Sequence, residues 1–195
     1  MRLKSTTTLC IIAAWLTFTS SAHAVNLVSN GGFETGDFTG WTLQGTQSTL
    51  FNVTDVLSHS GTYSMFFAEL EADDDQIQQI VPTTIGQQYS LDFWLLNSTD
   101  GNLGLGDDGL KVIWEGNTVF DLKPVDAPLG VWTPYSLPLT ATGNGSDLHI
   151  GGFDVPFAIY LDDISLTAVP EPGSLALATL SAIGFLAWRR RQRIA

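Results

Sequence analysis

The sequence predicts an all-β protein whose central domain is a sandwich of two antiparallel sheets. Apolar residues make up 44% of the 195 residues, charged residues only 14%, and glycines number 19. This composition is typical of short strands joined by many turns. Gly, Asn, Asp and Pro interrupt the chain about every 8 to 12 residues, and helical apolar periodicity does not persist, which is the pattern of a sandwich or barrel.

About nine to ten strands are expected, and those with the clearest pattern cover residues 62–69, 76–81, 87–97, 110–115, 118–122, 132–139, 148–153 and 157–167. In residues 87–97 the apolar side chains alternate with Ser90, Asp92 and Trp94, so one face is expected to be buried. Residues 115–117 (EGN) predict a hairpin turn. Pro134 and Pro138 place residues 132–139 at a sheet edge, because proline cannot donate to a ladder.

The charge distribution excludes one class of partner. All twenty acidic residues lie between Glu34 and Glu171, with only Lys111 and Lys123 among them, so this segment has a net charge of −18. Such a surface repels phosphate backbones, which excludes nucleic-acid binding. It attracts cations, above all calcium, whose preferred ligands are carboxylate and carbonyl oxygens.

Residues 1–24 have the features of a secretory signal peptide. Arg2 and Lys4 precede a short apolar stretch, and Ala22-His23-Ala24 supplies a small-x-small cleavage site. The apolar stretch is shorter than the roughly 20 residues that span a bilayer, so cleavage before Val25 is expected. The single cysteine, Cys10, lies in this leader, and the mature chain is therefore expected to have no disulfide.

Residues 169–195 combine three features in a fixed order. Pro170-Glu171-Pro172 is followed by the uncharged segment 173–188 and then by Arg189, Arg190 and Arg191. The segment is short for a membrane helix, although tilt or thinning can accommodate it, and the arginines would remain cytoplasmic. An ordinary C-terminal anchor is one interpretation.

The tail also resembles the PEP-CTERM sorting signal of Gram-negative bacteria. The resemblance implies export through the inner membrane by the export machinery, then processing by an exosortase-type membrane protease. The short apolar helix would be a temporary membrane anchor, and the cell surface or extracellular matrix would be the destination. Bacteria with this system typically make exopolysaccharide.

The segment between the two ends, 25–168, resembles galactose-binding-like jelly rolls, including carbohydrate-binding modules of the family 4/9 type. Three blocks support this resemblance: residues 26–34 (NLVSNGGFE) with Gly40-Trp41, residues 59–64 (HSGTYS) and residues 160–166 (YLDDISL). The first resembles the opening strand of that family and the last its closing strand. The resemblance implies a jelly-roll sandwich framed by these blocks.

In such jelly rolls a structural calcium often lies where the opening and closing strands meet. The resemblance implies side-chain ligands from Glu34 and Asp162, with backbone carbonyls near Asn30 and Ser60 completing an oxygen shell. Alternatively, Glu34 and Asp162 cap turns or face water. Asp163 would point to the opposite face from Asp162 in a regular strand, so only one of the two is expected to bind the ion.

Polysaccharide binding needs flat aromatic faces and polar groups that fix orientation. Trp94 beside Asp92 is the first candidate, followed by Trp114 and Trp132. Each tryptophan has the alternative of core packing.

Three functions remain open: an exported, non-catalytic protein that binds or scaffolds exopolysaccharide, a structural matrix protein without a ligand site, and a glycan-active enzyme. Catalytic motifs are absent, and the only histidines after the leader are His59 and His149. A pair of carboxylates occurs by chance among twenty acids, so it does not support a glycosidase. The non-catalytic function is preferred.

Overall fold

The computed structural model describes residues 25–45, 50–68, 75–98, 108–122, 128–154 and 158–170, and the isolated positions 183, 185 and 192. The predictions for Ala22, Ala24, Glu171, Pro172 and the three arginines therefore lie outside the described residues. Within the described part of the chain, the structure contains no helix long and apolar enough to cross a membrane.

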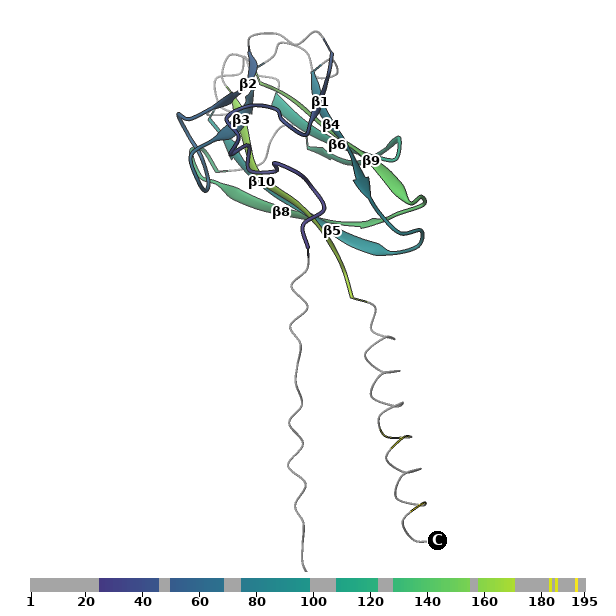
Figure 1. Cartoon of the computed structure of the whole chain (residues 1–195). Helices are drawn as coiled ribbons and strands as arrows, with labels where there is room; N and C mark the ends of the chain where they lie inside the picture. Colours follow the sequence, from purple (N-terminus) through teal and green to yellow (C-terminus); the bar gives the residue numbers. More distant parts are fainter. Residues whose placement is uncertain are drawn as a thin grey trace, which may run out of the picture.

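In the described part of the chain, ten strands form two five-stranded sheets (Figure 1). The first sheet has the order β1-β4-β9-β6-β7, and we call it sheet A. Its strands are β1 (Thr42–Gln44), β4 (Gln76–Pro82), β9 (Gly145–Asp154), β6 (Asp108–Trp114) and β7 (Asn117–Leu122). The second has the order β2-β3-β10-β5-β8, and we call it sheet B. Its strands are β2 (Phe51–Thr54), β3 (Ser64–Phe67), β10 (Ile159–Ala168), β5 (Gln88–Asn97) and β8 (Thr133–Thr140).

All strand pairs are antiparallel, so the all-β, two-sheet prediction is confirmed. The expected hairpin is present between β6 and β7, where Glu115 and Gly116 both have positive φ. Strand β8 lies at the edge of sheet B, as its prolines predicted. The short strands β1 and β2 were not predicted.

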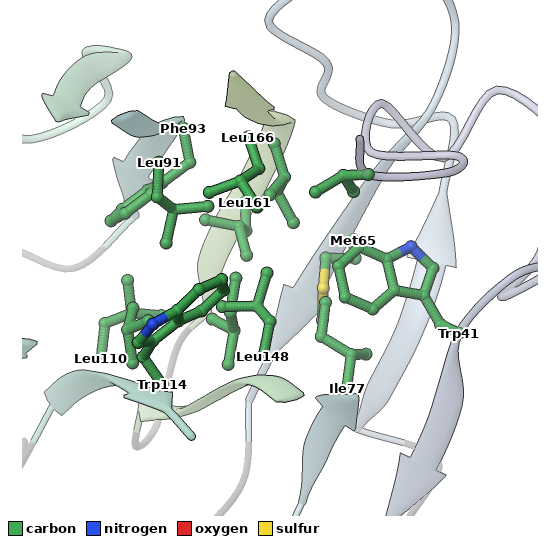
Figure 2. Packing of buried hydrophobic residues seen from close by; sticks show 14 of the residues in the cluster. Trp41, Met65, Ile77, Leu91, Phe93, Leu110, Trp114, Leu148, Leu161 and Leu166 are labelled. Atoms are coloured by element: carbon green, nitrogen blue, oxygen red, sulfur yellow. The ribbon is translucent and has the colours of Figure 1, made fainter. Parts of the chain in front are cut away.

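The core lies between the two sheets (Figure 2). Alternate residues of β5, including Leu91 and Phe93, point inward and meet Leu148 and Ile150 of β9 in one cluster. These side chains are at most 1% exposed. Burying an aliphatic or aromatic side chain contributes about 1.5–3 kcal/mol relative to leaving it in water, so this cluster is the main source of stability.

The N-terminal segment joins β10, as the resemblance implied, but it is not a strand. Leu27 N donates to Leu166 O at 2.9 Å, and Ile164 N donates to Gly31 O at 2.9 Å. Around the second contact the chain forms turns, with positive φ at Asn30 and Phe33. The first and last described segments of the domain leave the sandwich at the same end (Figure 1).

Candidate functional site

The outer face of sheet B carries a buried carboxylate. Asp162 is paired with Trp94 across β10 and β5, and its side chain is 0% exposed. The loop that follows β2 covers it, since His59 N and Ser60 N donate to Asp162 Oδ2 at 2.8 and 3.2 Å. Asp163 N donates to Oδ1 at 2.7 Å. Burial raises the pKa of Asp162 to about 6, although these amide bonds oppose the shift.

Asp163 does not follow the regular alternation that the sequence predicted. The ladder of β10 shifts register between Asp162 and Ser165, and Asp163 has a φ of 51°. A bulge of this kind redirects side chains. Asp163 accordingly lies beside Asp162: its Oδ2 is 2.6 Å from His59 Nδ1, and Ser60 Oγ donates to its Oδ1 at 2.7 Å.

Gly32 leaves room beside these two carboxylates. A Cβ placed on Gly32 would lie 3.5 Å from Asp163 Oδ1, 3.6 Å from Asp162 Oδ1 and 3.8 Å from Glu34 Cγ. Three of the acidic side chains therefore border one glycine. A buried carboxylate whose own partners are backbone amides, next to such a space, has the chemistry that fits an oxygen-bound cation.

The remaining predicted ligands agree less well with a cation site. Glu34 accepts hydrogen bonds from Thr62 N and Tyr63 N, each at 3.0 Å. Ser60 borders the two aspartates, as described above. The call for carbonyls near Asn30 stays a prediction, and the carbonyl of Asn30 itself already accepts hydrogen bonds from Phe33 N and Trp41 Nε1. Among the described residues, no three carboxylate or histidine side chains converge on one point as a ligand set.

Aromatic rings gather next to Asp163. The His59 ring stacks on Trp94, with centroids 3.8 Å apart and planes inclined by 14°. Trp132 meets the same ring in a T-shaped contact, with centroids 5.8 Å apart and planes inclined by 67°. Asp92 lies two residues along β5, on the same face as Trp94, and accepts from Ser90 Oγ at 3.1 Å. The structure therefore brings together three of the four residues predicted to bind sugar.

Trp114 does not join them, and the expectation for this residue is wrong. Its side chain is 4% exposed in the core, and its Nε1 donates to Thr140 O at 3.1 Å. It belongs to sheet A and points inward, opposite Leu148 in the ladder (Figure 2). Neither ring face is available to a sugar.

The sequence reasoning missed a hydrogen-bonded row on the outer face of sheet A. Gln44 Nε2 donates to Gln78 Oε1 at 2.7 Å, and Gln78 Nε2 donates to Asp147 Oδ1 at 2.8 Å. Asp147 Oδ2 is 2.9 Å from His149 Nε2. We call these four residues, Gln44, Gln78, Asp147 and His149, the polar row.

The polar row crosses β1, β4 and β9, because Thr42 pairs with Gln78 and Gln78 pairs with His149. The side chains of Asp147 and His149 are 39% and 21% exposed. The signal that could have found the row is the alternation of polar residues in QIQQI and DLHIG, which places glutamine, aspartate and histidine on the faces opposite the core.

Comparison with known proteins identifies both parts of the chain. Residues 25–150 match the model of a family described as a carbohydrate binding domain. The chain belongs to this carbohydrate-binding domain family. Residues 168–191 match the PEP-CTERM protein-sorting motif. Together these matches indicate an exported carbohydrate-binding protein.

A curated relative of the domain is endo-1,4-beta-xylanase A of Thermoanaerobacterium saccharolyticum, which is 26% identical over 151 residues. The match covers 72% of this chain but only 12% of that relative's length. Among solved structures, TmCBM61 in complex with beta-1,4-galactotriose has a TM-score of 0.56 at 20% identity. That match covers 75% of this chain and 100% of that one.

A second solved structure is the CBM22-1 xylan-binding domain from Paenibacillus barcinonensis Xyn10C. It has a TM-score of 0.54 at 19% identity, covering 76% of this chain and 97% of that one. Both structural likenesses concern the fold, and they confirm the jelly-roll prediction for the sandwich.

Proposed function

We propose that this protein is a non-catalytic, exported polysaccharide-binding protein, and that its polar row contacts the polysaccharide. The single observation that carries the proposal is the row itself, in which four hydrogen-bonding side chains from three strands are fixed by one another on the outer face of a sheet. A sugar chain has rows of hydroxyl groups, and side chains held in one geometry lose little entropy when they bind them.

The negative charge of the domain limits which polysaccharides it is expected to bind. With a net charge of −18 over residues 34–171 and Asp147 in the row, the surface repels uronate and sulfate groups. A neutral polysaccharide is the expected ligand. Examples are xylan, for which one structural neighbour is named, a galactan built from the beta-1,4-linked galactose units present in the complex of the other, or a neutral exopolysaccharide.

A second candidate surface is the aromatic cluster His59–Trp94–Trp132 on sheet B. Its supporting observation is that the side chains of Trp94 and Trp132 are only half-buried, so part of each ring is open to a sugar. His59 already stacks on one face of Trp94, which is why we prefer the polar row.

The two surfaces are tested by one set of variants. Binding of the mature chain to galactan, xylan and a uronate polymer is measured by affinity electrophoresis and calorimetry. Gln78→Ala and His149→Ala are expected to weaken binding roughly fivefold each, which corresponds to about 1 kcal/mol per hydrogen-bonding group. Gln88→Ala, an exposed glutamine on the other sheet, is the matched control. Loss of binding in Trp132→Ala alone would assign the ligand to the aromatic cluster.

We further propose a structural calcium ion beside Gly32, with side-chain ligands from Glu34 and Asp162 and backbone carbonyls near Asn30 and Ser60, as the sequence predicts. The buried carboxylate of Asp162 supports this site. When bound, the ion supplies positive charge where the loop after β2 meets β10. Trp94 is linked to this place through His59 and Asp163, so calcium would also order the aromatic cluster.

The proposed processing follows the sequence. Residues 1–24 are removed as a leader, residues 25–168 form the binding domain, and the tail 169–195 anchors the chain in the inner membrane until an exosortase-type protease processes it. The protein then belongs to the cell surface or matrix of a Gram-negative bacterium. Mass spectrometry of the secreted protein tests both ends, since retention of residues 173–195 would contradict the processing step.

The non-catalytic part of the proposal is supported by the match of residues 25–150 to a family described as a carbohydrate binding domain. Incubation with bound polysaccharide is expected to release no new reducing ends. Their appearance in parallel with binding would support the glycan-active alternative.

A further inference from the structure

The polar row has a fixed hydrogen-bond direction, because a carboxylate lies within it. Asp147 Oδ1 accepts from Gln78 Nε2 at 2.8 Å, and Asp147 Oδ2 lies 2.9 Å from His149 Nε2. An ionised carboxylate can accept hydrogen bonds but cannot donate them. Both neighbours of Asp147 must therefore donate, and this requirement orients the amide of Gln78 and selects the protonated nitrogen of His149.

This direction places a hydrogen-bond acceptor at each end of the row. The oxygen of Gln78 faces Gln44, whose Nε2 donates to it at 2.7 Å, so the acceptor Oε1 of Gln44 points away from that bond. At the other end, a neutral imidazole with its proton on Nε2 has an acceptor at Nδ1. Within the described part of the chain, His149 Nδ1 forms no hydrogen bond. A ligand that lies along the row therefore meets an acceptor at both ends.

Few charged groups surround His149 apart from the aspartate of the row itself. On β6 its partner in the ladder is Ile113, and Lys111 of the same strand faces Asp121 of β7. The carboxylate of Glu115, beyond the end of β6, is held by the loop between β8 and β9. Strands β1 and β4 contain only uncharged residues. Of the side-chain types on this face, histidine is the one that ordinarily changes charge between pH 5 and pH 8.

We infer that the polar row selects sugar hydroxyl groups that donate to its two end acceptors, and that protonation of His149 weakens the binding. This inference rests on the proposed function, in which the row contacts a polysaccharide. A hydroxyl group that donates to Nδ1 must turn round when that nitrogen gains a proton, and its other hydrogen bonds are then reversed or lost. His149 is therefore the residue that makes the affinity depend on pH, and Asp147 is the positioning residue that sets its tautomer.

The tautomer is measured first, by nitrogen NMR of the imidazole rings in the mature chain at pH 8 without polysaccharide. His149 is expected to carry its proton on Nε2, whereas His59, whose Nδ1 is 2.6 Å from Asp163 Oδ2, is expected to carry it on Nδ1. His149→Ala assigns the two sets of signals. Asp147→Asn keeps the shape of the side chain but can donate through its amide, so it is expected to admit the Nδ1–H tautomer of His149. Asp55→Asn is the matched control, because Asp55 is exposed and follows β2 of the other sheet, and it is expected to leave the spectrum unchanged.

An Nδ1–H tautomer of His149 in the parent overturns the inference, whatever the protein binds. An Asp147→Asn spectrum identical to that of the parent overturns the positioning role of Asp147.

Calorimetric titration with xylan and galactan at pH 8 and pH 5 then tests the effect on binding. The parent and Asp55→Asn are expected to bind roughly fivefold more weakly at pH 5, which is the loss expected for one hydrogen-bonding group. His149→Ala is expected to bind equally at both pH values. Binding by the parent that does not change with pH, or that weakens equally in His149→Ala, overturns the inference and leaves the proposed function in place. Absence of binding at both pH values overturns the proposed function together with it.

Discussion

The buried carboxylate of Asp162 makes a measurable prediction about stability and pH. Its pKa is raised from 3.8 to about 6 by burial, so the folded state binds the proton more tightly than the unfolded state does. Without calcium, the protein is therefore stabilised at low pH and loses that stability as the pH rises from about 4 through about 6. At 1.36 kcal/mol per pKa unit, the loss is about 3 kcal/mol.

The assay is urea unfolding of the mature chain from pH 4 to pH 8 in metal-free buffer, with Asp162→Asn in parallel. The parent is expected to lose about 3 kcal/mol more than the variant over this range. Asp37→Asn is the control. The exposed carboxyl of Asp37 has a pKa lowered by hydrogen bonds from Thr39 and Thr35, so it titrates below this pH range. Removing it is expected to leave the slope between pH 5 and pH 8 nearly unchanged.

Adding calcium to both proteins distinguishes the effect of burying Asp162 from the effect of binding an ion. At a concentration 100 times its dissociation constant, calcium adds about 2.7 kcal/mol to the parent, because the bound ion favours the ionised carboxylate. The same addition is expected to leave Asp162→Asn nearly unchanged. Parallel pH curves for parent and variant would refute the burial argument, and equal calcium shifts in both would refute the ion site.

The remaining predictions concern structural contacts. Burial raises the pKa of Glu115, but hydrogen bonds from its neighbours lower it further, so the net pKa is lowered. The stability that the Glu115 carboxylate contributes is therefore lost as the pH falls through its folded pKa. Glu115→Gln is expected to make the free energy of unfolding depend less on pH in the acid range. Gly31→Ala is expected to lower the free energy of unfolding by about 2 kcal/mol, because the new Cβ would overlap the Ile164 carbonyl. The control in the same urea assay is Gly145→Ala, because a Cβ at Gly145 meets only a side chain at 3.5 Å. Trp114→Ala is expected to cost about 3–5 kcal/mol without changing polysaccharide affinity once folded, and a selective loss of affinity would contradict its assignment to the core.

The sequence predicted the fold because alternation and turn residues are local signals. The alternation in residues 87–97 and the prolines of 132–139 placed β5 and β8 correctly. The strands Thr42–Gln44 and Phe51–Thr54 were missed because three or four residues are too few to show a period. The join between Leu27 and Leu166 followed from the family resemblance, since residues 26–34 have no strand geometry of their own.

The site was predicted only in part, because strand register and the face to which each side chain points are not local properties of the sequence. The sequence of a hairpin does not show locally which of its faces points inward, so Trp114 could be offered as a sugar-binding candidate while core packing stayed open. A bulge is equally invisible, and it turned Asp163 toward Asp162 instead of away from it. The polar row joins residues as far apart as Gln44 and His149, and only strand pairing brings them together.

The most direct test of the proposed function is calorimetric titration of the mature chain with neutral polysaccharides, repeated with Gln78→Ala, His149→Ala and the control Gln88→Ala. We expect the parent and the control to bind a neutral polysaccharide, and the two polar-row variants to bind it roughly fivefold more weakly. Equal affinity in all four proteins, or binding of the parent to no polysaccharide, would contradict the central claim.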